Sequence, residues 1–493
     1  MSSHESMLLG HLTHPPQGAD DVSRRPGGAH ESMLLGHLTH PPRGADDVSR
    51  RPGGAHFDAV IIGAGPAGSA AAILLARAGW SVALVERQGF PRRKVCGECI
   101  AASNLPLLRL LGVGALFEAH AGAPLRQVAV VHGDTVALAD LPAAPGRSDA
   151  QRWGRPLGRA TLDLLLIQQA ERVGADLWQP WAVQAVSGTA GHWQCELRSS
   201  QANVRATLSA QVLIAANGAW ERTPWQATGP RRPHGASDLL AFKANFNGAH
   251  LPEGMLPLLA LDGGYGGMVV SAPGVTTVAC CVRRDRLARL RDAAPQSSAG
   301  DAVEAWLRRQ SSVVGRSLSG AHRDEPWLAA GPITPGIRLR ADDTILRIGN
   351  AAGEAHPILG EGISMALQSA ALLCARLLAG STPGLAPAAG PQVAIARDYA
   401  ARWRAHFAPR LRVAALLAQV AMRRHPAELL LGLARAWPGL LTQGARWGGK
   451  THCAVDLPAL ARVLGKTAPV RPVSAAVNPS ATPASADVRS HAA

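Results

Sequence analysis

A glycine-rich loop between an apolar run and a small-residue stretch constrains the fold of this chain more than any other feature. The loop follows the apolar run 57–62 and opens the stretch 66–78, which ends before Gly79. Its sequence, Gly63-Ala64-Gly65-Pro66-Ala67-Gly68, fits the pattern G-x-G-x-x-G. A second apolar run follows at 81–85, so we expect a strand, a helix and a strand within about 30 residues, as in a parallel crossover.

Each glycine of this loop has its own physical role. The first permits a tight turn, the second lets the backbone approach a pyrophosphate, and the third lets the helix pack on the strand. The helix start then presents unpaired N–H groups to the phosphates. Glu86 ends the second strand, where a carboxylate can bind a ribose hydroxyl, and Arg87 follows it. We predict a dinucleotide site here; the alternative is a glycine turn that binds nothing.

A second motif points to the kind of dinucleotide. Residues 348–364 read Ile-Gly-Asn-Ala-Ala-Gly-Glu-Ala-His-Pro-Ile-Leu-Gly-Glu-Gly-Ile-Ser. This stretch resembles the second FAD motif of the flavoprotein hydroxylases related to p-hydroxybenzoate hydroxylase. The resemblance implies that Gly349 and Asn350 hold the ribityl chain of FAD. It also implies that four residues lie against the isoalloxazine ring, namely Pro357, Gly360, Gly362 and Ile363.

The same resemblance adds two positions and a co-substrate. Arg159 matches the arginine that precedes a helix and approaches the cofactor in this superfamily. Asn217 occupies the place of an aspartate that helps with FAD and NAD(P)H in the hydroxylases. We therefore expect FAD as the cofactor and NAD(P)H as a transient co-substrate. No second G-x-G-x-x-G follows a strand later in the chain, so we expect a single dinucleotide-binding domain.

Cys96 and His356 are the predicted catalytic residues. The segment 90–98 resembles the corresponding segment of geranylgeranyl reductases, in which the cysteine lies near the flavin. Cys96 and Cys99 form a C-x-x-C, so a redox dithiol, half a zinc site or inert packed thiols remain alternatives. Zinc needs a second ligand pair at a suitable spacing, so we predict no metal site. His356 beside the flavin loop is a candidate acid or base, or a side chain that packs on the loop.

The motifs define the expected fold class and domain order. We expect a Rossmann-type α/β FAD-binding domain interrupted by a mostly antiparallel substrate domain and followed by a helical region. The limits are 57–225 and 341–380 for the FAD-binding domain, 226–340 for the substrate domain and 381–466 for the helical region. One helix, at 161–174, is expected to interrupt the strands between 125 and 346. The tail 467–493 and the leader 1–56, in which 4–29 recur almost unchanged as 30–55, are expected to be disordered.

Charge and hydropathy bear on the expected partners. The net charge is +15, and 393–466 hold ten Arg and two Lys against Asp398, Glu428 and Asp456. No known nucleic-acid-binding module is present, so we predict no nucleic-acid partner. No continuous apolar run reaches the length of about 18 to 20 residues that a membrane-spanning helix needs, so we expect a cytoplasmic protein. Arginines and tryptophans in 393–466 predict peripheral membrane contact, with helices that cover a sheet as the alternative.

The predicted function is that of a FAD-dependent, NAD(P)H-using monooxygenase acting on an aromatic or polyketide-like hydrophobic small molecule. It rests on the resemblance at 348–364. A reductase or dehydrogenase of the geranylgeranyl-reductase type is the alternative suggested by 90–98. A non-enzymatic binding protein on the same fold is a third possibility, against which the intact loop at 63–68 and Glu86 argue.

Overall fold

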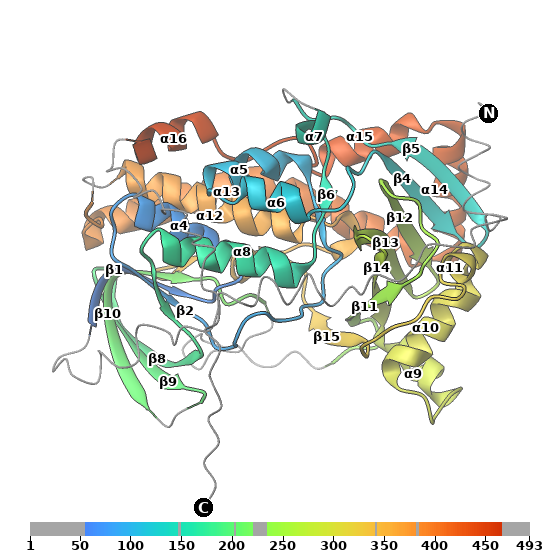
Figure 1. Ribbon diagram of the computed structural model, residues 1–493, viewed down its shortest axis with the longest axis horizontal. Helices are drawn as coiled ribbons and strands as arrows, with labels where there is room; N and C mark the ends of the chain where they lie inside the picture. The colour runs from blue at the N-terminus through green and yellow to red at the C-terminus, as the bar shows by residue number, and fades with distance from the viewer. Residues whose placement is uncertain are drawn as a thin grey trace, which may run out of the picture.

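The computed structural model describes residues 55–145, 149–201, 204–219, 234–340, 343–380 and 384–465 (Figure 1). Almost all of the predicted leader and all of the predicted tail lie outside these residues, so their disorder stays a prediction. Two layered units, each built on a seven-stranded sheet, make up the described chain. The C-terminal helices pack across both of them.

The first sheet is the predicted Rossmann-type unit. Its strand order is β7-β2-β1-β10-β9-β8, with β17 paired to β10. The pairs β7–β2, β2–β1, β1–β10 and β10–β17 are parallel, whereas β9 pairs antiparallel with β10 and β8. The bounds are β1 (Ala55–Ile62), β2 (Val82–Val85), β7 (Asp176–Trp178), β8 (Trp181–Thr189), β9 (His192–Ser199), β10 (Arg205–Ala215) and β17 (Leu346–Arg347).

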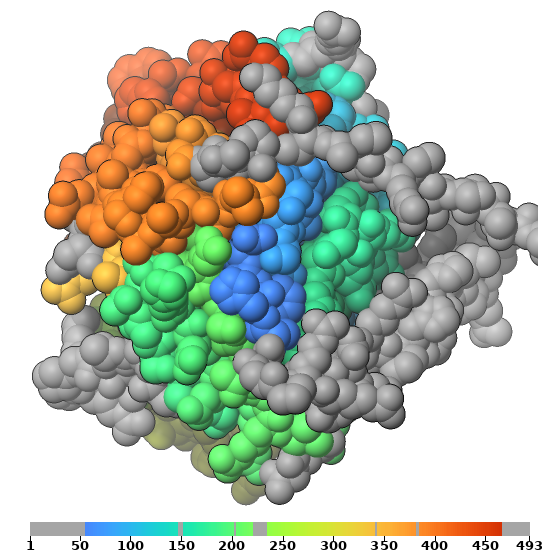
Figure 2. Space-filling model, turned by 90° about the vertical axis from the view of Figure 1, so that its left-hand side faces the viewer, coloured from blue at the N-terminus to red at the C-terminus, as the bar shows by residue number. Residues whose placement is uncertain are grey.

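Three helices cover one face of this sheet. They are α4 (Pro66–Arg77), α8 (Arg159–Arg172) and α12 (Gly362–Ala379), stacked together above the strands in Figure 1. Residues 66–75 of α4 are all buried, because α8 and α12 both pack against it. Alanine dominates this helix, and small side chains permit such close approach. On the face drawn in Figure 2, residues from the last third of the described chain lie beside those of its start.

The second sheet has the order β15-β11-β14-β13-β12-β4-β5. Its pairs are antiparallel except for β12 with β4. The bounds are β4 (Gln127–His132), β5 (Thr135–Asp140), β11 (Leu239–Asn247), β12 (Met255–Leu261), β13 (Gly264–Ala272), β14 (Val275–Arg283) and β15 (Leu328–Ile333). Strands β4 and β5 come from the stretch assigned to the FAD-binding domain, so two distant segments build the substrate-side sheet.

Helices interrupt the strands between 125 and 346 more often than expected. Besides α8, the structure has α7 (Asp149–Arg152), α9 (Arg284–Asp292), α10 (Ala299–Gln310) and α11 (Ser312–Ser317). The expectation of one helix was therefore wrong. Ser298 caps α10 by accepting a hydrogen bond from the Asp301 N–H, and Val303, Trp306 and Leu307 bury one face of that helix against the second sheet. Short amphipathic helices of this kind give little periodic signal.

The helical C-terminal region is confirmed. It consists of α13 (Ala389–Ala421), α14 (Arg424–Ala436), α15 (Gly439–Trp447) and α16 (Leu457–Gly465). Helix α13 packs on α12, whereas α14 and α15 pack on β5 of the second sheet. The short elements are β3 (Cys99–Ile100), β6 (Arg155–Pro156), β16 (Gly336–Ile337), β18 (Gly353–Glu354), α5 (Leu105–Leu110), α6 (Gly114–His120), α7 (Asp149–Arg152), η1 (Ala102–Asn104), η2 (Gly349–Ala351) and η3 (Pro357–Leu359).

The expectation that no apolar segment is long enough to span a membrane was wrong for helix α12. Among the described residues it is the helix whose length and composition would suffice to cross a membrane, and 78% of it is buried inside the protein. Its apolar character is explained by its position between α4 and α13 in the core.

Candidate FAD site

The loop after β1 has the geometry that a bound pyrophosphate requires. Gly63 adopts a φ of +102°, and a Cβ there would lie 2.6 Å from the Ala216 carbonyl oxygen. A Cβ on Gly68 would overlap the carbonyl oxygen of Gly63. A Cβ on Gly65 would instead meet nothing closer than an Arg92 nitrogen at 3.9 Å. The loop is thus closed toward the protein at Gly63 and Gly68 and open at Gly65, where a ligand would approach.

The start of α4 offers donors toward that opening. Gly65 is the N-cap of α4, no side chain caps it, and Pro66 begins the helix with Ala67 behind it. The first N–H groups of an α-helix have no partners within the helix, and its dipole is positive at that end. An anionic phosphate therefore fits this helix start.

Glu86 lies buried at the C-terminal end of β2. One carboxylate oxygen accepts a hydrogen bond from the Ala64 N–H at 3.0 Å, which ties Glu86 to the loop. The other accepts from the Gln88 N–H at 2.9 Å and from Arg92 at 2.8 Å. Arg87 is exposed beside it. The predicted ribose-binding acid is thus placed within reach of the loop.

At Gly349 the second FAD motif, residues 348–364, contacts the first glycine loop and helix α4. Its φ is +58°, and a Cβ there would lie 2.9 Å from the Cβ of Ala67 in the first turn of α4 and 3.9 Å from Ala366 of α12. Its N–H donates to the Ser369 hydroxyl at 2.8 Å. Asn350 follows, with its amide 3.4 Å from Glu354. Gly349 thus separates the starts of α4 and α12, as expected if both face one elongated cofactor.

The loop before α12, like the loop at Gly65, has open space beside its backbone. Pro357 begins the 3-10 turn η3, and Gly360 ends it at a φ of +61°, a conformation that favours glycine. A Cβ on Gly362 would meet nothing within 4 Å, and no side chain caps the start of α12 at Gly362 and Ile363. The structure therefore leaves space and free N–H donors where the resemblance places the flavin ring.

A buried charge cluster that the sequence analysis missed supports this loop. Glu361 is 1% exposed and lies 3.3 Å from the Lys450 ammonium and 3.6 Å from the Arg410 guanidinium. Lys450 also donates to the Leu359 carbonyl at 2.6 Å. Burial lowers the pKa of Lys450, but Glu361 and Cys99 together raise it, so the pKa lies above its usual value. The C-terminal region thereby fixes the flavin loop from behind.

Cys96 lies beside Arg159 at the junction of the two units. Both C-x-x-C cysteines are free thiols, Cys96 half-buried and Cys99 buried. Burial raises the pKa of the Cys99 thiol, and Lys450 offsets part of that effect. Burial lowers the pKa of Arg159, but Asp163 and the Cys96 thiol together raise it above the usual value. An effectively permanent positive charge therefore faces Cys96.

Glu98 joins this junction to the second sheet. It is 2% exposed and has a φ of +56°, a conformation uncommon outside glycine. Its carboxylate accepts from Lys243 of β11 at 2.5 Å, from Thr277 of β14 at 2.6 Å and from the Arg159 N–H at 2.8 Å. The sequence contained a signal for this network, because Lys243 is one of four lysines and stands within an apolar strand.

His356 links the flavin loop to the second sheet. Its Nδ1 lies 3.3 Å from the hydroxyl of Tyr265 on β13, a residue that is 1% exposed. Burial lowers the pKa of His356 and raises the pKa of Tyr265 well above its usual value. At neutral pH the pair is therefore uncharged and holds a proton between the loop and the sheet. Asn217 is also buried, next to Gly63 on the opposite side of the site.

The lowered pKa of His356 predicts an acid-sensitive fold. Below about pH 6.5 the unfolded chain binds a proton at this histidine more readily than the folded chain does, so stability falls as the pH drops. Urea unfolding at pH 7.5 and pH 5.5, each about one unit from that value, gives the free energy of unfolding at both. Between the two pH values, His356→Gln should lose less of this free energy than the wild type does. The exposed variant His192→Gln is the control, and an unchanged pH dependence in His356→Gln would contradict the assignment.

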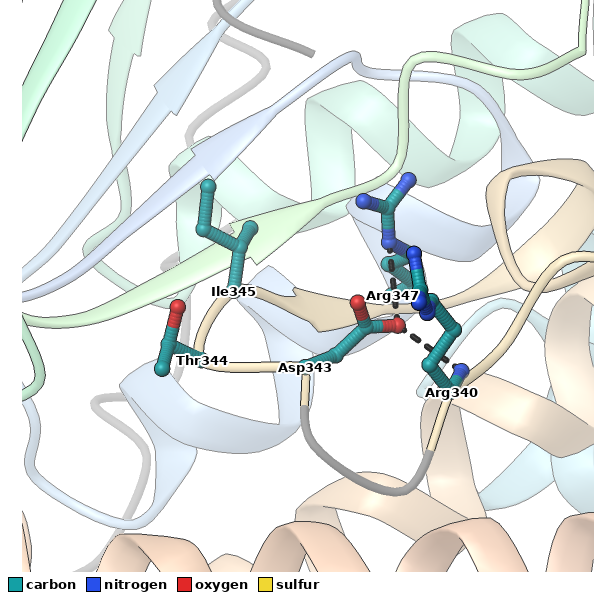
Figure 3. A pocket seen from close by; sticks show the side chains of 5 residues that line it. All are labelled: Arg340, Asp343, Thr344, Ile345 and Arg347. Atoms are coloured by element: carbon teal, nitrogen blue, oxygen red, sulfur yellow. Dashed lines mark hydrogen bonds and ion pairs between the residues drawn. The ribbon is translucent and has the colours of Figure 1, made fainter. Parts of the chain in front are cut away.

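One small pocket lies apart from the FAD loops, and a second lies beside the flavin loop. A cavity of about 200 Å³ lies at the start of β17 and is lined by Arg340, Asp343, Thr344, Ile345 and Arg347. Figure 3 shows the Asp343 carboxylate turned toward the two arginines. None of the loop residues expected to bind FAD lines this cavity. A second cavity, of about 20 Å³, is lined mostly by apolar residues, including Leu125 and Leu256, with Cys99 and Lys450 at the flavin loop.

The glycine loops, the parallel sheet and the two uncapped helix starts fit FAD, which would span from Glu86 past Gly65 and Gly349 to Gly362. These glycine loops and helix starts, on a Rossmann-type fold, are the features of the FAD-dependent oxidoreductase superfamily that the motifs predicted. Residues 56–387 match the family described as the FAD binding domain. The match covers more than half of the chain, so the chain belongs to that family.

The proteins similar to this chain include one named as a receptor and one named as a halogenase. Conditioned medium factor receptor 1 from Dictyostelium discoideum is 26% identical over 343 residues, covering 65% of this chain and 63% of that protein. The chain therefore spans less than two thirds of that relative. The structure of the myxobacterial chondrochloren halogenase CndH has a TM-score of 0.62 and 19% identity, covering 84% of this chain and 97% of that one.

A further neighbour is PqsL from Pseudomonas aeruginosa, described as a probable FAD-dependent monooxygenase. Its TM-score is 0.57 at 17% identity, covering 76% of this chain and 100% of that one. At these identities the solved structures show a shared fold. The predicted fold class is thereby confirmed.

Proposed function

We propose that this protein is a FAD-dependent monooxygenase that takes electrons from NAD(P)H and oxygenates a hydrophobic, aromatic or polyketide-like small molecule. In the overall reaction, substrate, O2, NAD(P)H and a proton give hydroxylated substrate, water and NAD(P)+. The observation that carries this proposal is the uncharged His356–Tyr265 pair between the flavin loop and the second sheet. It holds a proton at a buried position beside the expected flavin ring.

The residues of the chain have separable tasks in this reaction. Gly65 and the start of α4 bind the pyrophosphate, Glu86 binds the ribose, and Gly349 and Asn350 hold the ribityl chain. Bound FAD supplies electron acceptance and oxygen activation. The N–H groups at the start of α12 stabilise negative charge at the ring. The Tyr265–His356 pair supplies or receives a proton at the His356 ring nitrogen or the Tyr265 oxygen.

The substrate position follows from the packing of the two units. The face of the second sheet that carries Tyr265 and Lys243 is turned toward the flavin loop and the Cys96–Glu98 segment. The small apolar cavity between Leu125, Leu256 and Cys99 opens on the same junction. At about 20 Å³ this cavity has room for about one water molecule, so a substrate that binds at the junction must displace the side chains that line it.

The proposal is tested with purified full-length protein. We expect a visible flavin spectrum that bleaches when NADH or NADPH is added without oxygen. With air and a panel of phenols and quinols, at least one compound should gain a single oxygen atom, labelled when ¹⁸O2 is used. Denatured protein with free FAD is the control.

Three results would contradict this function in different ways. A flavin that is reduced only when a separate flavin reductase is added would remove NAD(P)H as the direct donor. A product that gains chlorine or bromine from added halide, instead of oxygen, would replace oxygenation by halogenation. A protein that binds no FAD would overturn the flavin site itself.

A further inference from the structure

Helices α14 and α15 expose an apolar surface on the outside of the second sheet. Helix α14 buries a single stripe, Ala427, Leu431 and Ala434, toward the sheet. Its other large apolar side chains face away, with Leu429 69% exposed. We call this set the α14–α15 surface; it consists of Leu429, Leu430, Leu433, Trp437, Leu440 and Trp447.

The spacing shows that the exposed residues form one face. Leu429 and Leu433 are four residues apart, so they lie along one side of α14, and Trp437 follows the helix as its C-cap. That side is opposite the stripe containing Leu431 and Ala434. Trp437 is 62% exposed and Trp447, at the end of α15, is 67% exposed. Single exposed leucines are ordinary, but a continuous exposed apolar face marks an interaction site.

Positive charge surrounds this surface. Between residues 423 and 447, which span both helices, the chain has four Arg against a single acidic residue, Glu428. Among the described residues of these two helices and their caps, three exposed arginines form no ion pair: Arg423, Arg435 and Arg446. The surface therefore combines leucines, tryptophans and unpaired arginines on helices that lie on the outside of the protein (Figure 1).

We propose that the α14–α15 surface docks on an anionic phospholipid bilayer. The leucines would enter the boundary of the acyl chains, Trp437 and Trp447 would lie at headgroup depth, and the arginines would bind lipid phosphates. Each basic residue near an anionic leaflet strengthens the binding. A second copy of the chain fits less well, because a two-fold contact would bring the unpaired arginines of both copies together.

The position of the surface connects docking to the FAD site. From Trp447 the chain runs through Gly448 and Gly449 to Lys450, which donates to the Leu359 carbonyl in the flavin loop. The bilayer would therefore lie one short segment from the apolar junction between the two units. The docking itself does not depend on the proposed oxygenation, since it rests on the surface alone.

Flotation of the full-length, FAD-loaded protein with vesicles tests the proposal. Vesicles of phosphatidylcholine alone are compared with vesicles that contain about one third phosphatidylglycerol, at about 0.1 M and about 0.5 M NaCl. We expect binding to the anionic vesicles that weakens with salt. The variant Leu429→Ser/Leu433→Ser/Trp437→Ser should lower vesicle binding at least about tenfold, because it removes large exposed apolar groups.

Matched variants separate docking from general effects. Leu385→Ser/Val393→Ser changes exposed apolar residues elsewhere, 59% and 46% exposed, and should leave vesicle binding unchanged. Arg423→Gln/Arg435→Gln should weaken binding to anionic vesicles and leave any binding to neutral vesicles as it was. The flavin spectrum of each variant reports whether it remains folded.

Three outcomes would overturn the proposal. The first is no binding of the full-length protein to anionic vesicles. The second is equal binding by the triple serine variant and the wild type. The third is a dimer in gel filtration that the triple serine variant dissociates, which would assign the surface to a second copy of the chain.

Discussion

Replacing Gly68 with alanine should abolish tight FAD binding, lowering the affinity at least about 100-fold, and should also destabilise the protein. A Cβ at this position would overlap the Gly63 carbonyl oxygen and lie 3.2 Å from the Ala216 Cβ. Both neighbours belong to the turn and strands that hold the loop, so α4 must move outward. Overpacking of this kind typically costs about 1–3 kcal/mol. Flavin fluorescence titration and urea unfolding measure the two effects.

Gly65→Ala tests the ligand position alone, because the added methyl group enters the space expected for FAD and contacts almost nothing in the protein. Gly65 has a φ of −71° and a ψ of −178°, which alanine adopts without strain, and its Cβ would have open space around it. We expect the FAD-free protein to keep its unfolding free energy while FAD binding weakens at least about tenfold, because the new methyl group occupies the pyrophosphate position. Gly89→Ala, with nothing within 4 Å of the new Cβ, is the control. Normal FAD binding by Gly65→Ala would show that the pyrophosphate lies elsewhere.

Replacing Lys243 with methionine should lower the free energy of unfolding by about 3–5 kcal/mol, as expected when one partner of a buried ion pair is removed. Glu98 is 2% exposed and Lys243 is 6% exposed, so water cannot compensate the remaining carboxylate. Thr277 and the Arg159 N–H still donate to Glu98, but both are neutral donors. The junction between the flavin side and the second sheet should loosen.

A second substitution should recover much of this loss. In Glu98→Gln/Lys243→Met no charge remains buried at the junction, so we expect the double variant to be more stable than Lys243→Met alone. Arg109→Met is the matched control, because it breaks a pair with Glu118 that is 34% and 41% exposed and should cost less than about 1 kcal/mol. Urea unfolding of the wild type, Glu98→Gln, Lys243→Met, the double variant and Arg109→Met decides between the alternatives. Additive losses would mean that the ion pair does not fix the junction.

Local patterns predicted the FAD half of the protein well, because each element there follows from neighbouring residues. The run 57–62 became β1, the small-residue stretch became α4, and Gly63 and Gly349 needed the positive φ angles that glycine permits. The helical C-terminal region was also evident from spacing. The second sheet was predicted less completely, since β4 and β5 join strands more than 100 residues away.

The sequence by itself determined the glycine loops, the order of strand, helix and strand, and membership in a FAD-dependent superfamily. These depend on backbone conformation and helix-start chemistry, which are properties of short segments. Only the tertiary structure decided which charged and polar side chains meet. Glu98 with Lys243, Glu361 with Lys450 and Arg410, and His356 with Tyr265 come from distant segments, and buried charges are tolerated only where the fold brings partners to them.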